Sequence, residues 1–118
     1  MRKNIAILGN TVFIEWIRTR SLQADVTMSV CTGALLLARA GLLDGLRVTT
    51  HHELLGTLRE LAPRAIVDPG ARYHDTGSLI TAAGISAGID SSLHRVARLL
   101  GAEASAETAA YMEYGPGH

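Results

Sequence analysis

Apolar positions recur along the chain in two rhythms, one typical of strands and one of helices. Short apolar runs rich in β-branched residues predict strands, which cover residues 4–8, 25–30, 46–50, 65–67, 72–75 and 79–82. Apolar residues three and four positions apart predict helices, which cover residues 12–22, 32–40, 53–61, 89–100 and 103–113. Strands that alternate with helices predict an α/β fold with a mainly parallel sheet flanked by helices.

Local signals place the ends of several elements. Thr11 is expected to cap the helix over 12–22, and Gly41 to follow the end of the helix over 32–40. The strands 72–75 and 79–82 are expected to form a hairpin through the turn at 76–78.

The most informative stretch is residues 28–38, where an apolar strand reaches Cys31 and a helix follows at once. A helix N-terminus lowers the pKa of a thiol, because its partial positive charge favours the thiolate. The free N–H groups that begin at Thr32 can bind an oxyanion. Cys31 is therefore a candidate nucleophile. The alternative is that Cys31 is only a small buried hydrophobic residue.

His51 follows a predicted strand that is expected to lie beside the strand before Cys31. A nucleophilic cysteine commonly needs a base or a cationic neighbour, so His51 is a candidate catalytic residue, against the alternative of a structural role. The adjacent His52 is expected to point elsewhere. His74 and Asp75, in the hairpin, are expected at the surface.

A third corner, residues 84–88, is rich in glycine. It lacks the lysine of a P-loop and the spacing of a dinucleotide site, so close packing of a strand–helix turn is the favoured interpretation. The cysteine and histidines do not have the spacing of zinc ligands. We expect no metal and no cofactor.

Composition narrows the class of protein. With 118 residues the chain is expected to form a single domain over 1–118. Lys+Arg and Asp+Glu both number 11, so there is no net charge to attract nucleic acid or anionic lipid. The apolar runs are too short to span a membrane. A lone cysteine and the lack of a secretory signal favour the cytoplasm.

Three segments resemble the ThiJ/PfpI superfamily, which has the flavodoxin-like class I glutamine amidotransferase fold. Ser-Val-Cys-Thr-Gly-Ala at 29–34, with Ala-Gly-Leu-Leu-Asp-Gly at 40–45, resembles the nucleophile elbow and the following helix. Val-Thr-Thr-His at 48–51 resembles the Thr-Thr-His segment. Residues 80–90 resemble the last strand and the start of the long helix.

The resemblance implies roles for three residues: Cys31 as nucleophile, Thr32 on the oxyanion side, and His51 as a pocket neighbour. The Ser-Val-Cys-Thr-Gly form occurs in isonitrile hydratases, which add water to an isocyanide to give an N-substituted formamide. It also occurs in the sensor-like domain of arabinose-regulator-type transcription factors. The close of the chain, Glu-Tyr-Gly-Pro at 113–116, is similar to the hydratases, and no helix-turn-helix domain follows. We therefore expect a hydratase-like lyase acting on a small molecule; the alternative is a non-catalytic sensor-like or redox-sensing relative.

The chain departs from the family pattern in its length. The N-terminal part of the usual fold, including the acidic partner of the cysteine, has no counterpart here. Activity is expected to be impaired by that loss. An open sheet also leaves a strand edge uncovered, so we expect a homodimer in which a partner covers the edge at 4–8.

Overall fold

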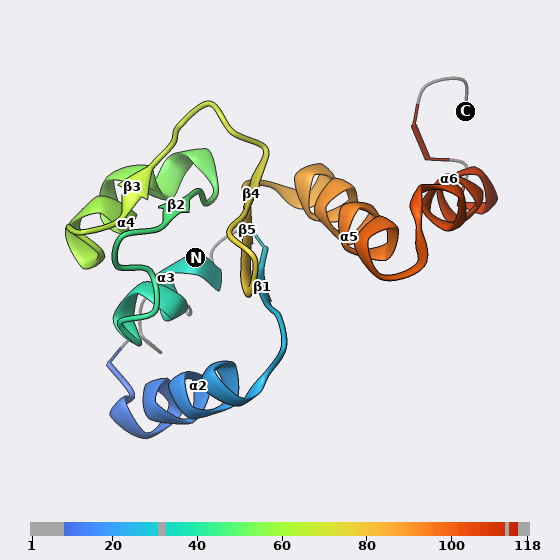
Figure 1. Ribbon diagram of the computed structural model, residues 1–118. Coiled ribbons are helices and arrows are strands. Elements are labelled where there is room, and N and C mark those ends of the chain that lie inside the picture. Colours follow the sequence, from blue (N-terminus) through green and yellow to red (C-terminus); the bar gives the residue numbers. More distant parts are fainter. Residues whose placement is uncertain (1–8, 31–32, 113, 116–118) are drawn as a thin grey trace. The chain divides into compact units, whose positions relative to one another are not determined.

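The computed structural model describes residues 9–30, 33–112 and 114–115 (Figure 1). The chain divides into two compact units, Met1–Gly88 and Ile89–His118. All strands of the described ranges belong to the first unit. The strand expected over residues 4–8 lies outside the described residues.

The strands form two small sheets. One sheet has the order β1 (Thr27–Ser29), β5 (Leu79–Ala82) and β4 (Tyr73–Asp75), with β1 and β5 parallel and β4 and β5 antiparallel. The other pairs β2 (Arg47–Val48) with β3 (Ile66–Val67) in parallel. The expected hairpin is confirmed as β4–β5, and the fold is α/β with a mostly parallel sheet.

One side chain joins the two sheets. The backbone N–H of Thr49, just after β2, donates a buried hydrogen bond of 2.9 Å to the Thr81 hydroxyl of β5. The expectation that the strand before His51 lies beside the strand before Cys31 is therefore wrong. In the described part of the chain, β5 is the strand paired with β1, and β2 reaches that sheet through Thr81.

Helix α2 (Thr11–Gln23) begins one residue earlier than its pattern predicts. The side chain of Asn10, not of Thr11, accepts the capping hydrogen bond from the Phe13 amide at 3.0 Å. Asn and Thr both serve as N-caps, so the sequence pattern alone does not decide between two adjacent candidates. The helix starts one residue earlier than predicted, and its faces are the same.

Three further helical segments lie between the strands of this unit. They are α3 (Gly33–Arg39), the 3₁₀ turn η1 (His52–Leu54) and α4 (Leu55–Leu61). As predicted, Gly41 follows α3 with a left-handed φ of 73°, a conformation that glycine adopts without steric cost.

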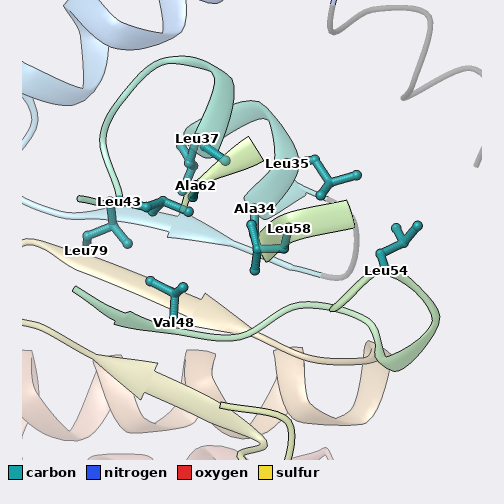
Figure 2. Packing of buried hydrophobic residues seen from close by; sticks show 10 residues of the cluster. Ala34, Leu35, Leu37, Leu43, Val48, Leu54, Leu58, Ala62 and Leu79 are labelled. Carbon is teal, nitrogen blue, oxygen red and sulfur yellow. The ribbon is translucent and has the colours of Figure 1, made fainter. Parts of the chain in front are cut away.

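The hydrophobic core lies where α3 and α4 meet β2 and β5 (Figure 2). Leu35 from α3 and Leu58 from α4 are completely buried, and Val48 of β2 packs into the same cluster. Apolar residues cover most of the circumference of α3, which explains why this helix is largely buried. The core therefore fixes the two helices that follow Cys31 and His51 in the sequence.

The second unit contains most of α5 (Ile85–Leu100) and all of α6 (Ala102–Tyr111). Helix α5 begins at residue 85, four residues before the start predicted for the helix over 89–100. Within this unit the Ser105 hydroxyl donates to the Leu93 carbonyl at 2.8 Å and ties α6 to α5. Across the described ranges, we find no helix that is long and apolar enough to cross a membrane.

Candidate functional site

The sequence predicts three turns that follow strands of the first unit, at Cys31, at His51 and at residues 84–88. Cys31 and Thr32, the centre of the expected site, lie outside the described residues. On either side, β1 ends at Ser29, α3 begins at Gly33, and the Gly33 amide donates to the Val30 carbonyl at 3.1 Å. This bond links the residue after β1 to the first residue of α3.

The first turn of α5 packs directly on this corner. A Cβ atom placed on Gly88 would stand 2.7 Å from Cγ1 of Val30, a distance at which atoms clash. Close packing is thus confirmed at Gly88, whereas a Cβ placed on Gly84 would meet nothing within 4 Å. Gly84 precedes the helix and Gly88 lies inside it, so the segment is mainly a helix start rather than a loop.

Buried hydroxyl groups gather on the strands that lead to the corners. Thr49, Thr50 and Thr81 are almost fully buried, and so is Ser29. Ser29 Oγ finds no hydrogen-bond partner in the described part of the chain, which is costly for a buried hydroxyl. These residues lie in the segments that carry the family resemblance, but the sequence alone assigned them no role; polar side chains inside apolar strand patterns were the signal that could have singled them out.

His51 caps the turn that follows it. Its Nδ1 accepts a hydrogen bond from the Glu53 amide at 3.2 Å, so the neutral ring carries its proton on Nε2. In this state His51 can donate a hydrogen bond from Nε2 but cannot accept a proton there. The ring stacks on that of His52 with centroids 4.3 Å apart, and the side chain of His52 is 78% exposed.

The capping bond predicts a stability effect at His51. His51→Ala should lower the free energy of unfolding by about 1 kcal/mol, because it leaves the Glu53 amide without its acceptor. His51→Asn, whose side-chain oxygen can also accept from this amide, should recover most of the loss. Urea denaturation of both variants measures the difference. Equal losses in the two variants would show that the cap contributes nothing.

His74 and Asp68 form a pair that the sequence did not predict. His74 Nε2 lies 3.0 Å from Asp68 Oδ2, and their side chains are 20% and 31% exposed. His74 and Asp75 are both half-buried, so they lie at the surface but are less exposed than a fully solvated pair. Hydrogen bonds from the Gly70 amide and from His74, with the nearby charge of Arg47, lower the pKa of Asp68 below its ordinary 3.8.

The lowered pKa of Asp68 predicts a dependence of stability on pH. A carboxyl whose folded pKa is depressed stabilises the fold above its unfolded pKa, and this stability is lost as the pH falls through the folded value. Asp68→Asn should therefore flatten the loss of stability below pH 3.8. Thermal melts between about pH 2 and 7 test this; parallel acid limbs for wild type and variant would contradict it.

The residues of the described ranges include no group of three or more His, Cys, Asp or Glu side chains that could hold a metal ion. Polar features that these residues do include are the histidine cap, the buried hydroxyls and the His74–Asp68 pair.

The mostly parallel sheet with its helices defines an α/β protein. In proteins of this class, sites form beyond the carboxyl ends of strands, and Cys31 follows such a strand end in the sequence. The chain belongs to the DJ-1/PfpI family, whose profile matches residues 5–97. The family inferred from the sequence motifs is therefore confirmed.

Named relatives include an enzyme and a regulator. The chain is 39% identical over 106 residues to isonitrile hydratase of Pseudomonas putida, covering 87% of this chain and 44% of that protein. It is 34% identical over 93 residues to the HTH-type transcriptional regulator GbdR of Pseudomonas aeruginosa, covering 79% and 25%.

Among solved structures, a ThiJ/PfpI family protein from Pseudomonas syringae matches with a TM-score of 0.87 and 30% identity. The match covers 98% of this chain and 46% of that one. The chain therefore spans less than half the length of these relatives.

Proposed function

We propose that the chain is a hydratase-like protein in which Cys31 adds to an isocyanide and water releases an N-substituted formamide. The observation that carries the proposal is the 39% identity to isonitrile hydratase over 106 residues, a span that takes in most of this chain. The hydrogen bond between Val30 and Gly33 supports it, because these residues follow a strand and begin a helix on either side of Cys31 in the sequence, and a helix start favours a thiolate.

The reaction divides into two steps with Cys31 as the nucleophile. In the first, the sulfur forms a bond to the terminal isocyanide carbon, and that carbon gains a proton to give a thioimidate. In the second, water adds to the same carbon, the carbon–sulfur bond breaks, and the formamide leaves with the thiol restored. The sum is isocyanide plus water to formamide, with no oxidant or reductant.

The roles of Thr32 and His51 follow from the hydrogen bonds that each can donate or accept. Thr32 would supply a backbone N–H on the oxyanion side. His51, with Nδ1 occupied by the Glu53 amide, would act as a pocket donor through Nε2 rather than as the base that activates the thiol. The general acid–base contribution, about 10²–10⁴-fold, would then fall to a carboxylate that a second chain supplies or to water.

The test is turnover of cyclohexyl isocyanide, followed by the formamide proton in NMR spectra. We expect wild type to form N-cyclohexylformamide, and Cys31→Ala and iodoacetamide-treated wild type to form none above the buffer blank. Because the chain has one cysteine, alkylation is a matched control for the substitution. Absence of product from wild type, or equal rates from Cys31→Ala, would overturn the proposal.

A second candidate is a sensor-like domain without catalysis, favoured by the 34% identity to a transcriptional regulator over 93 residues. It would bind a small molecule at the same corner and release it unchanged. Wild type would then show a saturable thermal shift with the isocyanide, no formamide, and the same shift in Cys31→Ala.

A further inference from the structure

One hydroxyl group of the first unit is buried without a use in the fold. Ser29 is 6% exposed, and its Oγ is a buried oxygen that has no hydrogen-bond partner among the described residues. Thr81 lies opposite Ser29 in the parallel pairing of β1 with β5, but its oxygen accepts a hydrogen bond from the Thr49 amide. An unpartnered buried hydroxyl costs free energy in folding, so the oxygen of Ser29 needs an explanation from another state of the molecule.

The side chain of Ser29 lies at the corner where β1 gives way to α3. Its Cβ is 3.4 Å from the position that a Cβ on Gly33, the first residue of α3, would take. Val30 meets a different segment, since its Cγ1 would stand 2.7 Å from a Cβ on Gly88. Successive side chains of a strand point to opposite faces, and the same period assigns position 31 to the side of Ser29.

The partner of the Ser29 oxygen cannot come from outside this unit. The oxygen is already enclosed by atoms of this chain, so a further segment that covered the surface of the unit would not reach it. The partner is therefore a group at the corner itself. A hydroxyl rotates to suit its surroundings, and ionisation of a nearby thiol would create a negative charge toward which its O–H can turn.

We propose that the Ser29 hydroxyl stabilises the thiolate of Cys31, by turning its O–H toward the negative charge two positions further along the chain. The inference rests on the proposed function, because it concerns the same nucleophile. In the thiol state the hydroxyl has only a weak acceptor, whereas the thiolate offers a charged one, and charge-assisted hydrogen bonds are the stronger kind. Burial strengthens the interaction further, because the local dielectric constant is low.

The pH dependence of alkylation by iodoacetamide tests the inference, since the chain has one cysteine. The thiolate is the form that reacts, so the rate rises with pH to a plateau through a midpoint set by the thiol. In Ser29→Ala we expect this midpoint to move to higher pH by about one unit, with alkylation about tenfold slower below it. Thermal melts should place Ser29→Ala at or above wild type, because alanine removes the unpartnered oxygen.

Ser21→Ala is the matched control, because it makes the same substitution at a hydroxyl that the fold uses. Ser21 Oγ lies 2.6 Å from the Thr27 hydroxyl in the same unit. This variant should melt at a lower temperature than wild type and keep the wild-type midpoint of alkylation. An unchanged midpoint in Ser29→Ala would mean that only an ordered water pairs with the hydroxyl, and would overturn the inference. A midpoint that moves equally in both variants would overturn it as well.

The alkylation profile does not depend on turnover, so the inference and the proposed function can fail separately. A shifted midpoint in Ser29→Ala, with no formamide from wild type, would support the role of Ser29 and overturn the hydratase. Formamide from wild type, with an unchanged midpoint in Ser29→Ala, would support the hydratase and overturn the role of Ser29.

Discussion

Leu35→Ala is expected to lower the free energy of unfolding by about 2–5 kcal/mol. Leu35 has no exposed surface and packs in the cluster with Leu58 and Val48 (Figure 2). Alanine removes buried methyl groups and leaves a cavity, because neighbours on two helices and a sheet cannot all close in. Urea denaturation followed by Trp16 fluorescence measures the change in the same unit of the protein.

Leu22→Ala is the matched control for this core substitution. Leu22 lies on α2 and is 70% exposed, so its truncation should change the unfolding free energy by less than about 0.5 kcal/mol. A comparable loss in both variants would mean that the cluster around Leu35 is not the core that holds this unit together.

Gly88→Ala is expected to destabilise the protein by about 1–3 kcal/mol. Helix propensity alone would predict the opposite, because alanine favours a helix more than glycine does. The new Cβ would stand 2.7 Å from Cγ1 of Val30, and valine has few other rotamers to adopt. Either Val30 or the start of α5 must move. Because Val30 precedes Cys31 in the elbow, the variant should also change the rate at which iodoacetamide alkylates the thiol.

Gly56→Ala is the matched control, because it makes the same substitution within a helix without a clash. Gly56 lies in α4 with nothing within 4 Å of an added Cβ, so alanine there should stabilise the protein by about 0.4–1 kcal/mol. Thermal melts of the two variants should therefore shift in opposite directions. A shift of Gly88→Ala toward higher temperature would show that Val30 yields without cost.

Local patterns were enough to place most helices and strands of the described ranges. The apolar period located α3 and α4, the turn residues at 76–78 located the β4–β5 hairpin, and Gly41 marked the end of α3. These features depend on neighbours in the sequence. The family, too, could be inferred from short motifs, since the elbow and the Thr-Thr-His segment are local.

Contacts between distant segments could not be inferred in the same way. The order of strands depends on which backbones meet, so the sequence did not show that β5 pairs with β1. The pairing of His74 with Asp68 and the close approach of Gly88 to Val30 likewise join separate elements. His51 was singled out as a possible base, but its capping bond to the Glu53 amide could be read only from coordinates.

The bond between the Thr49 amide and the Thr81 hydroxyl has a consequence for how this fold can vary in evolution. The ladders within each sheet are made by backbone groups, which almost any residue supplies. The buried link between β2 and β5 is made by a side-chain oxygen, which few residue types of that size supply. Other strand positions are therefore limited only by packing, whereas position 81 must also supply the oxygen, and relatives that keep both sheets joined in this way should retain threonine or serine there.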